Sequence, residues 1–158
     1  MNLRRIVFPT DFSERSQPAL ELATSLARDS GATLVVVHVQ EPPIDPVAAA
    51  GLALSELRLA PEVVLEELHR VVPTDPAVPV EHHLLVGIPA KEIVRFADKT
   101  DADLIVMGTH GRRGLAHLLM GSVAEAVVRR ANCPVLTVRT ASASKARSSD
   151  RPQPAGVE

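Results

Sequence analysis

Aromatic side chains are scarce in this sequence, and so are cysteine and excess basic charge. The 158 residues include three Phe but no Tyr or Trp, which excludes an aromatic stacking platform for single-stranded nucleic acid. The one cysteine, Cys133, can form neither an internal disulfide nor a cysteine-based zinc site. Seventeen Lys and Arg against nineteen Asp and Glu give a net charge of −2, so no broad basic surface for nucleic acid is expected.

Long hydrophobic runs are also lacking. No run approaches the roughly 18 to 20 apolar residues that a membrane span needs, so no membrane partner is expected. The first residues, Met1–Arg5, show no signal-peptide pattern, and we expect a cytoplasmic protein. With 46% hydrophobic and 23% charged residues, the composition is that of a globular domain with an aliphatic core.

Short β-branched segments alternate with segments of helical periodicity. The run TLVVVHV at 33–39 is almost continuously apolar, which is typical of a strand buried on both faces of a parallel sheet. Strands separated by helices favour right-handed crossovers and an α/β fold. Strands are predicted at 4–8, 33–39, 80–86, 103–107 and 134–139, and helices at 18–29, 64–72, from 87 onward and at 122–131. The predicted inward stripes are Ala19, Leu22, Ala23 and Leu26; Val64, Leu68, Val71 and Val72; Ile93, Phe96 and Ala97; and Ala124, Val127, Val128 and Ala131.

Two segments depart from this pattern. Residues 41–61 contain four prolines and are expected to form a mobile connection with one or two helical turns. Residues 141–158 contain no Leu, Ile or aromatic residue and are rich in Ser, Ala, Arg and Pro. Such a segment cannot bury enough apolar surface to order itself. One domain over residues 1–140 and a disordered tail over 141–158 are therefore predicted.

Four of the eight glycines lie between Gly108 and Gly121. This stretch begins where a predicted buried strand ends and finishes where a predicted helix begins. Glycines allow backbone N–H groups to approach an anion, and a helix N-terminus favours negative charge. A phosphate-binding loop is one interpretation; a stretch that merely turns the chain is the other. The spacing is neither that of a Walker A loop nor GxGxxG.

The spacing Gly-x2-Gly-x9-Gly-Ser/Thr after a hydrophobic strand resembles the nucleotide-binding signature of the universal stress protein family. Gly108, Gly111, Gly121 and Ser122 match it. The segments IVFPTDFSERSQPAL, VVVHV, GIPAKEIVRFA and CPVLTVR are also similar to that family, so the resemblance covers residues 1–139. It implies a Rossmann-like α/β fold with an open five-stranded parallel sheet in the order 3-2-1-4-5, helices on both faces, and an ATP site.

The resemblance also implies which residues bind the nucleotide. Asp11 would lie at the nucleoside end, backbone of Val39 would contact adenine, and the glycine loop would hold ribose and phosphates, with Mg²⁺. Asp11 has a second, compatible interpretation as an Asx turn or helix cap. His110 and Arg112 either touch phosphates or are solvated. The expected binding residues are Pro9, Thr10, Asp11, Val39, Gly108, His110, Gly111, Arg112, Gly121, Ser122 and Val123.

The other reactive side chains are expected to be structural. His82 and His83 are adjacent on a strand, so they point to opposite faces and cannot chelate a metal together. His38 is expected to be a hydrogen-bonded strand residue. Cys133 has no histidine partner in the pattern and is expected to be a packing residue rather than a nucleophile.

The function implied by the resemblance is that of an ATP-binding regulatory or stress-response protein with an unknown downstream protein partner. Two alternatives remain: a weak ATPase, and a protein-binding dimer that needs no nucleotide. Phosphoryl transfer needs a positioned base and neutralising charge, and the sequence shows no evident base. A homodimer through strand 135–139 is expected, because this edge strand carries no charge before Arg139.

Overall fold

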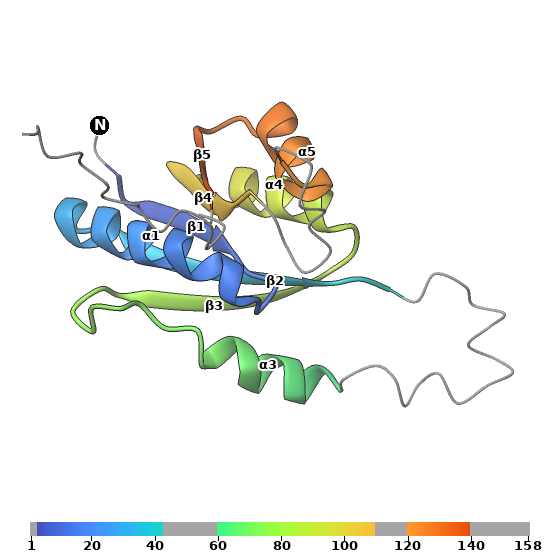
Figure 1. Cartoon of the computed structure of the whole chain (residues 1–158), viewed down its shortest axis with the longest axis horizontal. Helices are drawn as coiled ribbons and strands as arrows, with labels where there is room; N and C mark the ends of the chain where they lie inside the picture. Colours follow the sequence, from blue (N-terminus) through green and yellow to red (C-terminus); the bar gives the residue numbers. More distant parts are fainter. Residues whose placement is uncertain (1–2, 43–59, 110–119, 140–158) are drawn as a thin grey trace, which may run out of the picture.

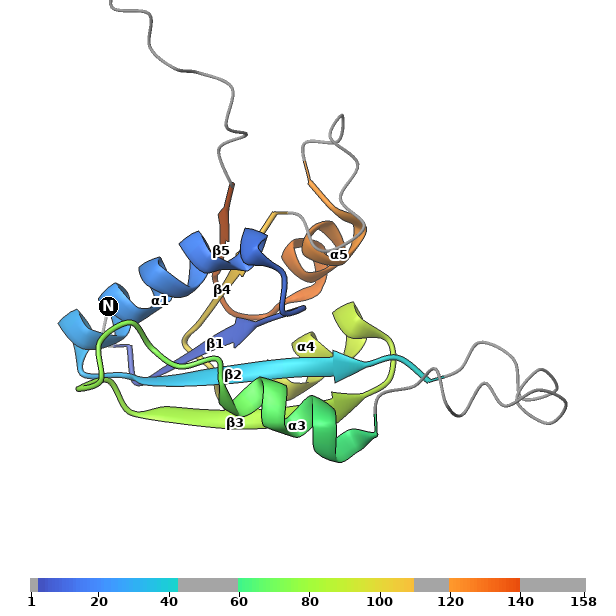
Figure 2. The ribbon, with the colours of Figure 1, turned by 60° about the horizontal axis from the view of Figure 1, so that its bottom comes forward.

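The chain folds around a five-stranded parallel sheet in the order β3-β2-β1-β4-β5, which confirms the predicted α/β fold. The structure is a computed structural model that describes residues 3–42, 60–109 and 120–139. Figure 2 shows β2 and β3 side by side, pointing the same way. The elements are β1 (Arg5–Pro9), the 3₁₀ turn η1 (Glu14–Ser16), α1 (Gln17–Ser30), β2 (Thr33–Gln40), α3 (Pro61–His69), β3 (Val80–Val86), α4 (Pro89–Lys99), β4 (Leu104–Gly108), α5 (Ser122–Arg130) and β5 (Val135–Val138).

Two hydrophobic clusters cover the two faces of the sheet. Alternate residues of one strand enter different clusters, as the period of two requires: Ile6 and Phe8 of β1 join α1 and α3, whereas Val7 joins α4 and α5. Figure 1 shows α3 beside β3 and α4 beside α5; α4 packs on β2 and β3, and α5 packs on β5. The sheet is thus buried on both faces in its central strands, as the continuous apolar run at 33–39 predicted.

Proline and glycine punctuate the helices where their backbone preferences suit. Pro18 lies within the first two positions of α1, and Pro61 and Pro89 begin α3 and α4, where a missing N–H costs no helical hydrogen bond. Gly31 ends α1 with a left-handed φ of 71°, and the next residue's N–H reaches back to Ala27. Helix boundaries therefore follow local sequence closely.

Three apolar residues predicted to face the core are instead exposed. Leu22 of α1, Val72 after α3 and Val128 of α5 are 36%, 52% and 45% exposed. In α1 the buried face is turned toward Leu20 and Thr24. Thr24 is buried because its hydroxyl donates to the Leu20 carbonyl at 2.8 Å and accepts the Thr74 N–H at 3.3 Å. A hydroxyl whose hydrogen bonds are satisfied inside the fold can replace an apolar residue at a helix interface.

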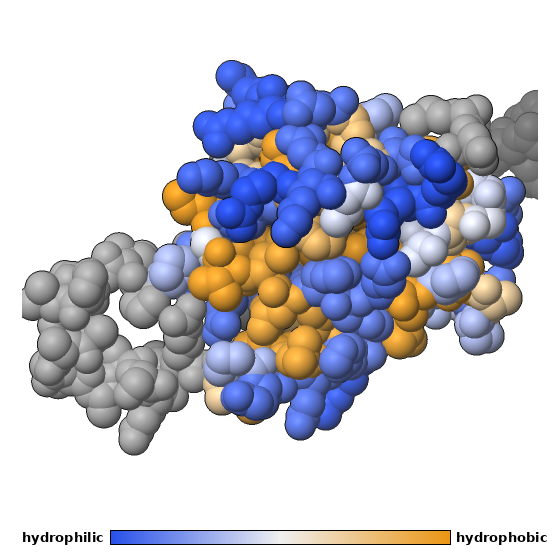
Figure 3. All heavy atoms as spheres, turned by 180° about the vertical axis from the view of Figure 1, so that it is seen from behind, coloured by the Kyte–Doolittle hydropathy of each residue, from blue (hydrophilic) through white to orange (hydrophobic). Residues whose placement is uncertain are grey.

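Exposed apolar side chains also occur near both edges of the sheet. Val86, the last residue of the edge strand β3, and Ile88 flank Gly87, and Leu136 lies on the other edge strand, β5. Figure 3, which shows the side of the molecule opposite to that in Figure 1, has hydrophobic side chains gathered in one area and surrounded by hydrophilic ones. Within the described ranges, no helix has the length and apolar character to cross a bilayer.

Asp103 joins the amino ends of β1 and β4. Its Oδ2 accepts the backbone N–H groups of Arg4 and Arg5 at 2.8 and 2.9 Å, and its own N–H donates to the Arg5 carbonyl. These hydrogen bonds hold the pKa of the Asp103 carboxyl below its ordinary value, and the bond from the Arg4 N–H has the larger effect. The charged carboxylate therefore stabilises the start of the central strand pair.

Replacing Asp103 by Asn is expected to lower stability at neutral pH and to reduce the acid sensitivity of the fold. Because the folded pKa is depressed, the stabilisation is present above the unfolded pKa, about 3.9, and is lost as pH falls through the folded pKa. Urea unfolding of both proteins between pH 7 and pH 3 measures this. The difference in unfolding free energy should shrink toward acid pH; a constant difference would contradict the assignment.

Any side chain at position 87 is expected to destabilise the fold. The Gly87 φ of 146° disfavours L residues, and a Cβ would lie 2.7 Å from Cγ of the buried Glu92. Gly87→Ala should lower the free energy of unfolding by about 1–3 kcal/mol. Gly31→Ala is the matched control, because its φ is also positive but its Cβ would meet nothing within 4 Å. Equal losses in the two variants would show that the Glu92 contact contributes nothing.

Candidate functional site

The carboxyl ends of β1 and β4 lie side by side, because β1 pairs with β4 in register Ile6↔Leu104 and Val7↔Ile105. The strand order reverses here: β2 lies on the other side of β1, and β5 lies beyond β4. In open α/β sheets this reversal leaves a crevice at the carboxyl ends, where ligands bind. The segment Pro9–Asp11 and the glycine-rich segment from Gly108 onward begin here, the first at the carboxyl end of β1 and the second at the carboxyl end of β4.

A buried threonine follows each of the two strands. Thr10 follows β1 and donates its N–H to the Val37 carbonyl of β2 at 2.9 Å, and Thr109 follows β4 and donates to the Val138 carbonyl of β5 at 2.9 Å. They are 8% and 3% exposed. Each threonine therefore extends the hydrogen-bond ladder outward from the central pair, and the chain leaves the sheet only after it.

Hydrogen bonds within the β1–α1 loop define its shape. The Asp11 Oδ1 accepts the Ser13 N–H at 3.1 Å and the Ser13 hydroxyl at 2.6 Å, which confirms the predicted Asx turn. The Thr10 Oγ1 accepts the Phe12 N–H at 3.1 Å. Phe12 has a φ of 63°, a region that non-glycine residues rarely occupy, so neighbouring contacts must hold it there.

The two ends of the glycine-rich segment meet at one hydrogen bond. The Gly121 N–H donates to the Thr109 carbonyl at 2.7 Å, and the Gly121 carbonyl accepts the Glu125 N–H as α5 begins. Gly121 is the N-cap of α5, and Ser122, which is exposed, is the first helical residue, so the Ser122 hydroxyl does not cap this helix. Within the part of the chain that the structure describes, no side-chain hydrogen bond caps this helix N-terminus.

The structure places eight of the eleven predicted binding residues. Pro9, Thr10 and Asp11 lie at the end of β1, Gly108 ends β4, and Gly121 and Ser122 begin α5. Val39, near the end of β2, and Val123 both pack against the cluster that includes α4 and α5. The three others, His110, Gly111 and Arg112, lie outside the described residues.

Three residues at the carboxyl ends of the strands, Thr109, His38 and Phe12, make contacts that no sequence motif indicated. Thr109 sits inside the glycine motif, whose spacing is defined by its glycines. His38 donates from Nδ1 to the Thr10 carbonyl at 2.8 Å, and its ring stacks on Phe12 with centroids 4.2 Å apart. A histidine two residues before the end of a buried strand was the only available signal, and it predicted no more than a satisfied polar group.

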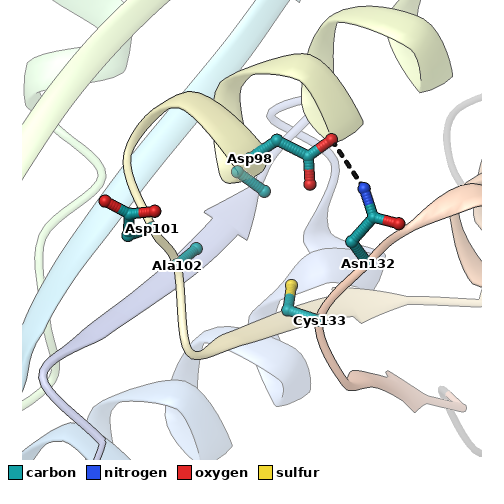
Figure 4. Close-up of a pocket in the computed structure, with 6 residues that line it drawn as sticks. Asp98, Asp101, Ala102, Asn132 and Cys133 are labelled. Atoms are coloured by element: carbon teal, nitrogen blue, oxygen red, sulfur yellow. Dashed lines mark hydrogen bonds between the residues drawn. The ribbon is translucent and has the colours of Figure 1, made fainter.

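A cavity of about 290 Å³ adjoins the β1–α1 loop. Thr10, Phe12 and Ser13 line it from the loop, and Val71 and Val72 line it from the segment after α3. A second cavity, of about 330 Å³, lies at the opposite edge of the sheet beside Asp98, Asn132 and Cys133, and Figure 4 shows the 3.0 Å hydrogen bond from Asn132 to Asp98.

Cys133 has the character expected of a packing residue. Burial, followed by the negative charges of Asp98 and Asp103, raises the pKa of its thiol. Its side chain packs against the α4 and α5 cluster. A thiol held in its neutral form is a poor nucleophile.

His82 and His83 point to opposite faces, as predicted. His82 Nε2 donates to the Val71 carbonyl at 2.8 Å, and its ring meets His69 of α3 edge-on. His83 packs against Phe96 of α4 on the other face. In the described part of the chain, no group of three or more His, Cys, Asp or Glu residues is arranged to hold a metal ion.

Known proteins are similar to this chain in sequence and in architecture. The Universal stress protein family model matches residues 2–139. A universal stress protein of Methanocaldococcus jannaschii, MJ0531, is 40% identical over 143 residues, covering 86% of this chain and 82% of the relative. A universal stress protein solved in complex with cAMP has a TM-score of 0.66 at 27% identity, covering 87% of this chain and 98% of its own.

A second solved structure is that of a universal stress protein from Archaeoglobus fulgidus in complex with dAMP. It has a TM-score of 0.61 at 30% identity and covers 87% of this chain and 98% of its own. The family model thus spans all the described strands and helices, and the relative from M. jannaschii is similar over nearly the same length. This chain belongs to the universal stress protein family.

Proposed function

We propose that this protein binds ATP, with Mg²⁺, at the carboxyl ends of β1 and β4, and that it acts as a nucleotide-dependent regulatory homodimer. The observation that carries the proposal is the 2.7 Å hydrogen bond between Gly121 and Thr109, which closes the glycine-rich segment at the N-terminus of α5. Family members of known structure have been solved with cAMP and with dAMP, which supports an adenine nucleotide as the ligand.

The residues present suit the phosphates of a nucleotide. The N-terminus of α5 carries the positive end of the helix dipole, and its N-cap residue, Gly121, has no side chain with which to cap it. Backbone N–H groups in the first turn are therefore oriented toward an anion placed there. Mg²⁺ bound to the phosphates keeps several of its waters and needs no dedicated protein cage. Asp11, on the neighbouring loop, supplies a carboxylate for the nucleoside end.

ATP is expected to bind to the purified protein near one equivalent and more tightly than GTP, and Gly121→Val is expected to abolish binding. Gly121 has φ −75° and ψ 157°, an extended backbone that valine adopts, so the variant adds a branched side chain to the phosphate site without backbone strain. Isothermal titration with ATP and with GTP, each with and without Mg²⁺, measures the effect, and mass spectrometry of the denatured protein detects nucleotide that co-purifies.

Gly31→Ala provides the control for this experiment. Gly31 lies between α1 and β2 at the amino edge of the sheet, so the control loses stability without touching the site. It should bind ATP like the unmodified protein. Unchanged ATP affinity in a folded Gly121→Val protein would rule out this site.

The second part of the proposal, the dimer, depends on the edge strand β5. In the described sheet β5 pairs on one side only, with β4, and Leu136 is 37% exposed although it is apolar. Val128, on the neighbouring helix α5, is 45% exposed. Two copies pairing antiparallel through β5 about a two-fold axis would satisfy both open edges and cover these side chains.

Leu136→Asp is expected to convert the dimer to monomer, because it places a charge in the pairing interface. Leu136 is a better test position than Val138, which packs against the core cluster of α1 and whose replacement would also destabilise the subunit. Light scattering at micromolar concentration should give twice the chain mass of 16.9 kDa for the unmodified protein and 16.9 kDa for the variant. Val72 is also apolar and exposed, and it follows α3, which packs on β3 and β2 rather than on β5; Val72→Asp should therefore remain dimeric. A monomer mass for the unmodified protein would refute the interface.

A further inference from the structure

We propose that His38 is a positioning residue of the nucleotide site: its Nδ1–H holds the Thr10 carbonyl and thereby fixes how the β1–α1 loop presents Asp11. This inference rests on the proposed function, because it assigns a role in binding the same nucleotide. His38 lies 28 residues from Thr10 in the sequence and on the neighbouring strand β2.

The geometry defines the protonation of the bonded nitrogen. The Thr10 carbonyl oxygen can only accept, so at 2.8 Å the His38 Nδ1 must carry the hydrogen. Phe12 stacks on the same imidazole, with an angle of 30° between the two ring planes. Phe12 also packs against the hydrophobic cluster on the face of the sheet that α1 and α3 cover, so the His38 bond lies on that face. One side chain of β2 thus contacts both the residue before Asp11 and the residue after it.

The consequence for Asp11 follows from the planarity of the peptide bond. The Thr10 carbonyl and the Asp11 N–H belong to one peptide unit, and the described chain contains no cis peptide bonds. In a trans peptide the two groups point in opposite directions. Holding the carbonyl against His38 therefore directs the Asp11 N–H away from the imidazole and sets the plane from which the Asp11 side chain starts.

The other hydrogen bonds described above for this loop do not use the Thr10 carbonyl. The Thr10 N–H continues the ladder to β2, and the Thr10 and Asp11 side chains bond forward to Phe12 and Ser13. These forward bonds close turns within the loop, whereas the bond from His38 ties the loop to the sheet. Thr10 is only 8% exposed, so a carbonyl that lost its donor would have little access to water in compensation.

Two substitutions separate the hydrogen bond from the ring. His38→Asn places an amide N–H where Nδ1 stands and removes the ring, whereas His38→Phe keeps an aromatic ring against Phe12 and removes the donor. We expect the ATP dissociation constant of the Phe variant to rise about tenfold, and that of the Asn variant to stay within about threefold of the unmodified value. In His38→Gln the side chain is one methylene longer than in the Asn variant, so its amide N–H is misplaced for the Thr10 carbonyl. This variant should lose ATP affinity as the Phe variant does.

His82→Phe is the matched control. His82 also donates from its ring to a backbone carbonyl at 2.8 Å, but that carbonyl belongs to Val71, after α3. Its loss should lower the melting temperature and leave ATP affinity unchanged, so stability loss alone does not imitate the effect. Titration calorimetry and thermal melts on all variants give the two readouts.

The outcomes distinguish this inference from the proposed function. The inference is supported if His38→Asn keeps its ATP affinity while His38→Phe and His38→Gln lose theirs. If the unmodified protein binds ATP and every His38 variant binds equally, or if Asn loses as much as Phe, the inference is overturned while the nucleotide site stands. If the unmodified protein binds no ATP, both fail.

Discussion

The parallel pairing of β1 with both β2 and β4 is the constraint on which the rest of the structure depends. It makes β1 the central strand, with Ile6 and Phe8 on one face and Val7 on the other, each fully buried. It also places the carboxyl ends of β1 and β4 next to each other, where the strand order reverses. The helices can then cover both faces, and the two loops can open onto one edge.

Thr10 and Thr109 give this edge its order before any ligand is considered. Each continues a ladder to the next strand, and each has a carbonyl used by a group from elsewhere: His38 for Thr10 and Gly121 for Thr109. The β1–α1 loop and the start of α5 are thereby tied to the rigid sheet. For the proposed nucleotide site, this anchoring of the two described loop ends would lower the entropic cost of association, because these groups are already ordered.

Most of the fold was predictable from local patterns, and part of the site was as well. The β-branched runs and the helical stripes with their prolines gave nine regular elements close to their observed limits, and the Asx turn of Asp11 followed from residue type. The failures at Leu22 and Val128 share a cause, whereas Val72 was misassigned because α3 ends at His69 and Val72 lies beyond it. Helical periodicity identifies an apolar face but not how far the neighbouring elements extend over it, and polar Thr24 took the inward position because Leu20 and Thr74 satisfied its hydroxyl.

The sequence by itself determined the alternation of strands and helices, the positions where glycine and proline end or begin them, and the motif spacing that identifies the family. Only the tertiary structure decided that His38 would hold the Thr10 carbonyl, that Phe12 would stack on that imidazole, and that Thr109 would receive the Gly121 N–H. The reason is physical: these contacts join segments 12 to 28 residues apart. Whether two such groups meet depends on strand order and register, which are set by packing of the whole sheet and not by the residues that make the contact.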